Sequence, residues 1–208
     1  YSKINNSGIF SYKQNKFSIF ALLGYSTDKN YSYVDRNREF SMINENSIVM
    51  QQFNREENKT KNAVYKIGID YNFNKFTTMG FTINSSTVRY KEGGNYIVNF
   101  KHDSDIDSIL TTLSTMGRDI DKLSANFNLN QKLPNEGEIN INFDYLNYKN
   151  LTDQTLFGNT ESQQGLPLGK YSLISNNPFV AKVRNGKVDY DTKLLKGTFS
   201  AGLQITNS

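Results

Sequence analysis

Residues 63–84 read AVYKIGIDYNFNKFTTMGFTIN, and apolar and polar side chains alternate along them. The odd positions from 63 to 73 are apolar or aromatic, whereas the even positions from 66 to 72 are polar or glycine. A period of two predicts a β-strand with two different faces. The alternation resumes after Asn74 and Lys75, so the stretch predicts two antiparallel strands joined by a tight turn.

Tight turns of this kind recur along the chain at intervals of 59, 61 and 61 residues. We expect them at Asn15-Lys16, Asn74-Lys75, Asn135-Glu136-Gly137 and Lys196-Gly197. Alternating strands flank each turn, most clearly in the last three hairpins. In the first hairpin Phe20 and Leu22 fall on the face opposite Ile19 and depart from the pattern. Four hairpins predict about eight antiparallel strands.

Three long polar segments separate the hairpins, at residues 27–62, 87–122 and 149–186. Parts of them, such as Ser47 to Phe53 and Tyr96 to Phe100, are expected to extend the strands beyond the membrane. The segments are rich in Asn, Ser, Asp, Glu, Lys and Gly, and we expect their middles to be mobile loops that meet a ligand. Short turns on one side and long loops on the other are typical of a membrane-spanning β-barrel.

The composition agrees with strands that bury only one face. Hydrophobic residues make up 37% of the chain and the mean hydropathy is −0.61, yet there are 13 Tyr and 14 Phe, which a disordered chain would lack. No apolar run approaches the roughly 18 residues of a transmembrane helix. We therefore expect residues 1–208 to form a single all-β region, an antiparallel up-and-down transmembrane β-barrel. An open sheet edge is very costly in lipid, so the strands must close.

Alternation alone leaves a soluble, secreted β-sheet protein open as an alternative, because a β-sandwich alternates too. Two features favour the membrane. Turns are short on one side only, and Tyr and Phe gather near the turns, as an interfacial aromatic girdle requires. These aromatic residues include Phe10, Tyr12, Phe17, Tyr71, Phe73, Phe76, Tyr190 and Phe199.

Little in the sequence points to catalysis. The chain has no cysteine, its net charge of +4 is scattered rather than gathered into a basic face, and its single histidine, His102, has no nucleophile motif beside it. The double glycine in the stretch 91–95 suits a loop turn and lacks a phosphate-binding pattern. We expect no enzyme, no catalytic or cofactor-binding residues, and no nucleic-acid partner.

A calcium loop is the one metal site that the sequence suggests. Asp103, Asp105 and Asp107 follow His102 at alternate positions, and hard cations favour clustered carboxylates. An EF-hand needs glycine and glutamate at its sixth and twelfth positions, where this chain has Ser108 and Ser114. We therefore expect a solvated acidic loop and no metal site.

Two hairpins resemble those of a known family. Residues 65–75 (YKIGIDYNFNK) with 79–84 (MGFTIN) resemble the K-x-G-x-D-Y-x-L-N-K-x-x-x-L-G-F hairpin of the outer-membrane β-barrel family of TonB-dependent receptors from Bacteroidetes-type bacteria. Residues 181–183 (AKV) and 187–190 (KVDY), followed by 195–197 (LKG) and 201–203 (AGL), resemble a later hairpin of that family, and the strand pattern extends over essentially the whole chain.

The resemblance implies a bacterial outer-membrane barrel of about 22 strands with an N-terminal plug, driven by TonB. This chain departs from that pattern: about eight strands are expected, with no recognisable plug, TonB-contact segment or signal peptide, and it ends at Thr206-Asn207-Ser208 without a terminal aromatic residue. We interpret it as an internal fragment of the barrel wall. A small barrel closed by eight strands alone stays open as an alternative.

The resemblance implies nutrient transport: a receptor wall in contact with outer-membrane lipid, an unknown nutrient ligand, and TonB reached through a plug outside this chain. A barrel that displays loops for adhesion or complex assembly, without transport, is the second hypothesis. No substrate follows from the sequence.

Overall fold

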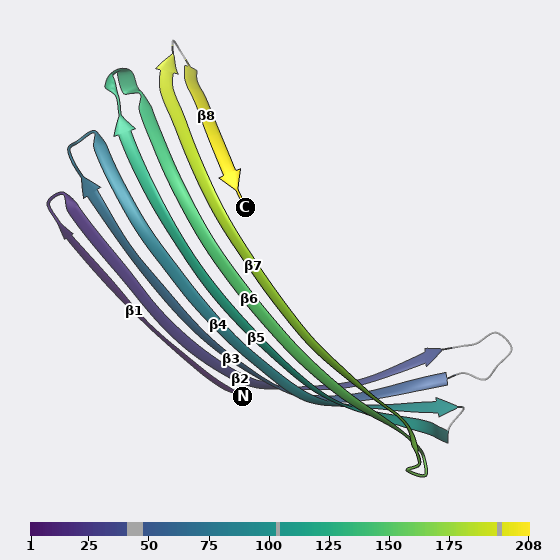
Figure 1. Cartoon of the computed structure of the whole chain (residues 1–208). Coiled ribbons are helices and arrows are strands. Elements are labelled where there is room, and N and C mark those ends of the chain that lie inside the picture. The colour runs from purple at the N-terminus through teal and green to yellow at the C-terminus, as the bar shows by residue number, and fades with distance from the viewer. Residues whose placement is uncertain (41–47, 103–104, 195–196) are drawn as a thin grey trace.

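The computed structural model describes residues 1–40, 48–102, 105–194 and 197–208, and these form one antiparallel sheet. Eight strands lie side by side in chain order, which confirms the all-β, up-and-down prediction with about eight strands (Figure 1). The strands are β1 (Ser2–Gln14), β2 (Phe17–Phe40), β3 (Ile48–Asn72), β4 (Thr77–His102), β5 (Asp105–Lys132), β6 (Glu138–Ser162), β7 (Pro167–Leu194) and β8 (Gly197–Asn207). Within the described ranges, no helix is long and apolar enough to cross a membrane.

The predicted tight turns lie together at one end of the sheet, which we call the turn end (Figure 1). Asn15 adopts a φ of 49°, a left-handed conformation that asparagine tolerates. The side-chain oxygen of Asn74 accepts hydrogen bonds from the backbone N–H groups of Phe76 (2.8 Å) and Thr77 (3.0 Å), so this side chain shapes its own turn. A single-turn 3₁₀ helix, Pro134–Glu136, makes the third turn. Of the fourth, Lys196 lies outside the described residues, and β8 begins at Gly197.

The prediction of long loops at the other end is wrong. β2 and β3 remain paired from Phe17 opposite Tyr71 as far as Phe40 opposite Ile48, so most of the polar segment 27–62 is strand. Residues 87–102 and 105–122 pair in the same way, and β6 and β7 are joined through residues 163–166 only. Polar side chains on both faces do not prevent a strand, because neighbouring strands satisfy the backbone groups. Short turns on one side only therefore cannot serve as an argument for the membrane.

The expected strand extensions are confirmed where they can be seen. Residues 48–53 belong to β3 and Tyr96 to Phe100 belong to β4, while Ser47 lies outside the described residues. Strands β2 to β7 have 24 to 28 residues, which makes them roughly 80–90 Å long at about 3.3 Å per residue.

The double glycine 93–94, expected in a loop turn, lies instead in the middle of β4. Gly94 is buried, and a Cβ there would meet Glu56 Cγ at 3.0 Å and the Arg55 carbonyl oxygen at 3.1 Å. A Cβ at Gly93 would meet nothing within 4 Å. Glycine therefore suits position 94 because β3 packs closely against it, and not because the chain turns there.

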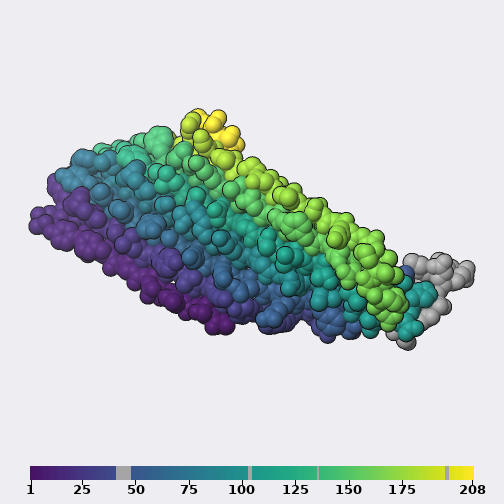
Figure 2. All heavy atoms as spheres, turned by 60° about the horizontal axis from the view of Figure 1, so that its bottom comes forward, coloured from purple at the N-terminus to yellow at the C-terminus, as the bar shows by residue number. Residues whose placement is uncertain are grey.

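The sheet is a single curved layer (Figures 1 and 2). No hydrophobic side chain among the described residues is buried, so this layer has no core of its own. It is also open: the pairing given by the described residues runs from β1 to β8 and does not join these two strands to each other. β1 covers only residues 17–29 of β2, and β8 covers only residues 184–194 of β7.

Candidate functional site

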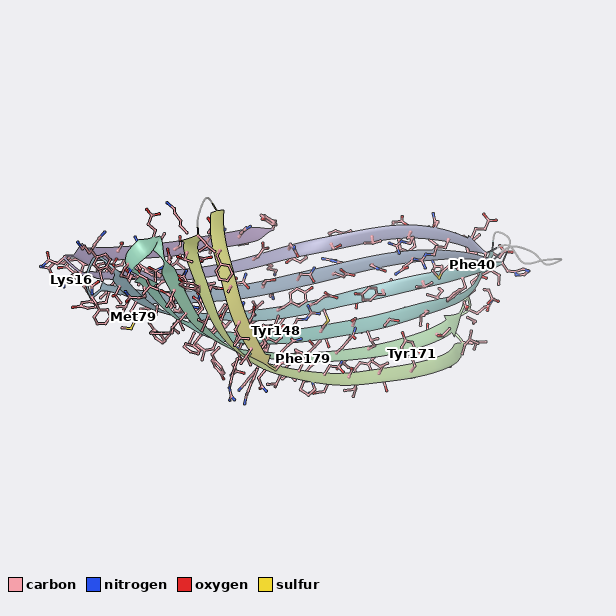
Figure 3. The ribbon with its side chains drawn as sticks, turned by 90° about the horizontal axis from the view of Figure 1, so that it is seen from above. Lys16, Phe40, Met79, Tyr148, Tyr171 and Phe179 are labelled. Atoms are coloured by element: carbon pink, nitrogen blue, oxygen red, sulfur yellow. The ribbon has the colours of Figure 1, made fainter. Side chains whose placement is uncertain are left out.

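The two faces of the sheet differ most in its turn-end half. One face, the band face, carries rows of apolar side chains that run across all eight strands. In one row, Tyr12 on β1 is followed by Ile19, Ile69, Phe81, Phe127, Phe143, Gly186 and Ile205 on the successive strands. Adjacent rows add Phe17, Ile67, Tyr71, Met79, Ile83, Leu123, Leu129, Ile141, Val188 and Leu203. We call these rows the apolar band; Figure 3 labels Met79 near the turn end.

Large side chains of the apolar band are open to the surroundings. Phe143 is 55% exposed, Ile67 53% and Leu203 67%. A hollow of about 590 Å³ lies over Gly186 on this face, beside Phe127 and Phe143, whose ring centroids are 6.2 Å apart. A contiguous apolar surface of this extent marks a site that contacts something apolar.

The opposite face, the polar face, is joined by side-chain hydrogen bonds at the same depth. The Asp144 carboxylate accepts hydrogen bonds from Asn126 (2.6 Å) and from Asn185 (3.1 Å). The Asn185 oxygen in turn accepts from Gln204 and from Thr206, both at 2.9 Å. This chain of contacts links β5, β6, β7 and β8, so the polar face is built for an aqueous or polar surrounding.

Phe20, which departed from the alternation, has a structural reason to lie on the polar face. It is paired with Gly68 of β3, and its ring lies where a Cβ of Gly68 would be. The ammonium group of Lys66 lies 5.3 Å from the centre of the same ring, a cation–π distance. An aromatic ring across a glycine on the neighbouring strand is a recognised way to hold register.

Further from the turns the polar face carries a cluster of tyrosines and glutamates, which we call the tyrosine–glutamate cluster. It consists of Tyr90, Glu92 and Tyr96 on β4 and Glu56 on β3. The Tyr90 hydroxyl donates to Glu92 Oε2 at 2.5 Å. Burial and this hydrogen bond raise the pKa of Tyr90. Burial, and then the hydrogen bond to Glu56, raise the pKa of Tyr96 to about 12, so both phenols remain protonated donors at neutral pH.

Tyr171 completes this surface on the side of β7 (Figure 3). Its ring lies over Gly158 of β6, and its hydroxyl is 2.8 Å from the hydroxyl of Thr112 on β5. Thr112 is only 8% exposed, and Ser114, two residues further along β5, is 4% exposed. Aromatic rings, hydroxyl groups and carboxylates thus share one face, a combination suited to ligands that carry several hydrogen-bond donors.

The band face beyond the apolar rows is charged. The Glu57 carboxylate pairs with Lys59 at 2.6 Å and with Lys29 at 3.2 Å, and these hydrogen bonds lower the pKa of Glu57 to about 2. Arg89 pairs with Asp121 at 2.7 Å and with Asp119 at 3.7 Å. Beyond the apolar band the band face therefore carries charges, together with exposed apolar side chains such as Leu113 and Phe157.

The residues suspected of metal binding are not brought together in the part of the chain that the structure describes. His102 is opposite Asp105 near the end of β4, and Asp107 lies on β5, while Asp103 is outside the described residues. The described ranges contain no group of three or more metal-ligating side chains.

The tyrosine–glutamate cluster was missed in the sequence because its segments were expected to be loops. The signal is present: Tyr90, Glu92, Gly94 and Tyr96 continue the even-numbered face that begins at Gly80 and Thr82.

Comparison with protein-family models gives no match, and comparison with curated proteins gives none either. The functional argument therefore rests on the surfaces described above.

Proposed function

We propose that this chain forms part of the wall of a bacterial outer-membrane β-barrel transporter of the TonB-dependent receptor type, which takes up a nutrient. The observation that carries the proposal is the apolar band: exposed on one face of all eight strands, and backed at the same depth by a hydrogen-bonded polar face. In water such a band would be an exposed hydrophobic surface, whereas in a bilayer it contacts lipid.

The height of the apolar band supports this proposal. On β3 it extends from the turn to Ala63, about ten residues, which at about 3.3 Å per residue and a tilt of about 40° gives roughly 25 Å along the membrane normal. That is the height of the apolar band of outer-membrane barrels. Beyond it the strands carry polar and charged side chains on both faces, with some exposed apolar ones on the band face such as Leu113 and Phe157, as the surface of strands that project into water can.

The edges of the sheet favour a larger barrel over a closed eight-stranded one. Among the described residues, β1 and β8 each have one paired side, and both lie at the depth of the apolar band. Unpaired backbone groups are very costly in hydrocarbon, so further strands must cover both edges. The polar face would then line the interior, and the tyrosine–glutamate cluster would meet the nutrient near the outer opening.

Growth of the source bacterium tests transport. A strain lacking the full-length protein should grow normally on rich medium but fail on one nutrient of a panel of metal chelates, glycans and peptides. Loss of TonB should produce the same defect. Normal growth on the whole panel, with or without TonB, would refute transport.

The second candidate is a barrel that displays its projecting strands for adhesion or complex assembly. The length of β2 to β7 beyond the apolar band favours it, because transport alone does not require such projections. Co-purification of a stable protein partner, together with unimpaired uptake in the deletion strain, would favour display.

A further inference from the structure

Cations gather on the band face directly beyond the apolar band. Strand register places Lys29 of β2 opposite Lys59 of β3, and Lys59 opposite Lys91 of β4. One row nearer the band, Lys61 is opposite Arg89. We call these five side chains the cation rows. We propose that they bind the phosphate groups of lipids in the leaflet furthest from the turns, an inference that rests on the proposed membrane location.

Their arrangement is unfavourable without a counter-ion. Like charges directly opposite each other on neighbouring strands destabilise a sheet, and here three lysines form one row. Glu57 neutralises part of this charge through Lys29 and Lys59, and Asp119 and Asp121 pair with Arg89. Among the described residues, Lys61 and Lys91 have no carboxylate within ion-pair distance, and both are exposed. The rows therefore retain positive charge that an outside anion can pair with.

Their depth matches the head-group region of a bilayer. Lys61 and Lys59 lie two and four residues beyond Ala63, at the end of the apolar band. With the same rise and tilt, they lie roughly 5 and 10 Å beyond the hydrocarbon boundary. Head-group regions are about 5–8 Å deep on each side of the hydrocarbon, so Lys61 lies within this layer and Lys59 just outside it, and lysine side chains are long enough to place their charge there.

On β3 and β4 the cations lie on the face that would contact lipid, whereas the corresponding row of the polar face has its cations on other strands, Lys3 of β1 and Arg118 of β5. On the polar face of β3 and β4 at the same height, the side chains are Asn58, Thr60, Tyr90 and Glu92, which carry no positive charge. A basic surface built for a soluble anion inside a barrel would lie on that polar face. The contrast favours lipid phosphate as the ligand.

Lipid binding by the full-length protein in detergent micelles tests this inference. Dioleoyl phosphatidic acid and dioleoyl phosphatidylcholine are titrated, and bound lipid is counted by native mass spectrometry. The test variant is Lys59→Gln/Lys61→Gln/Lys91→Gln. The matched control is Lys3→Gln/Lys13→Gln/Lys122→Gln, which removes three exposed lysines from the polar face.

The unaltered protein and the control should both prefer phosphatidic acid, and the test variant should bind it roughly tenfold to a hundredfold more weakly. Equal binding by the test variant, or an equal loss in the control, would overturn the inference. Full competition by inorganic phosphate at the same concentration would assign the rows to a free anion and also overturn it. Extraction without detergent would instead refute the membrane location, so the two failures are distinguishable.

Discussion

Phe81 offers a sharp test of what covers the apolar band. It lies on β4 near the middle of the band, between Ile69 and Phe127, and is 43% exposed. An arginine near the midplane of a bilayer costs about 2–4 kcal/mol in a β-barrel. The substitution Phe81→Arg should therefore lower the folding equilibrium constant roughly 30- to 700-fold. If water covered this surface, the same change would stay within about 0.5 kcal/mol.

The neighbouring residue provides the matched control. Thr82 lies one position along β4 and on the polar face, opposite Gly68 and Asn126. Thr82→Arg introduces the same charge at the same depth but away from lipid, and should cost clearly less.

The assay is a guanidinium titration of the full-length protein in phospholipid vesicles. The folded fraction is measured by the mobility difference between unheated and heated samples on a detergent gel. Equal stability of the two arginine variants would refute the reasoning.

Three further outcomes are expected. Gly68→Ala should destabilise the protein by about 1–3 kcal/mol because its Cβ overlaps the ring of Phe20, and should cost much less when Phe20→Ala is also present; equal costs in a double-mutant cycle would contradict this. Asn185→Ala should cost about 1–3 kcal/mol and speed amide hydrogen exchange in β8, since it removes three hydrogen bonds, and unchanged exchange would argue against the network. The pKa of Glu57 is lowered from its ordinary 4.5 to about 2, so its ionised carboxylate stabilises the folded state above pH 4.5, and this stabilisation is lost as the pH falls toward 2. Lys59→Gln should raise the pKa of Glu57 in a carboxyl NMR titration, and an unchanged pKa would refute the ion pair.

The sequence predicted the turn-end half well because one face there is apolar. Alternation such as that around Ile67 and Ile69 sets both the strand and its register, since a slip by one residue would place Lys66 and Asp70 on the apolar face. The turns were visible because Asn15 and Asn74 have side chains suited to them.

The rest of the strands could not be read in the same way. Beyond the apolar band both faces carry many polar side chains and the apolar ones are scattered, so the alternation weakens although the backbone pairing continues. Pairing between strands depends on neighbours far apart in the sequence, which local composition does not reveal. Phe20 shows the same limit: its position makes sense only once Gly68 is placed beside it.

Site-directed spin labelling along β3 can show whether lipid covers the apolar band. The chain has no cysteine, so a single introduced cysteine is the only labelling site within it. Cysteines are introduced one at a time at Ile67, Ile69 and Tyr71 on the band face and at Lys66 and Asp70 on the polar face. In membranes that contain the full-length protein, the band-face labels should be accessible to oxygen dissolved in lipid, and the polar-face labels to a water-soluble nickel chelate. Access of the nickel chelate to all five positions would contradict a lipid-covered apolar band.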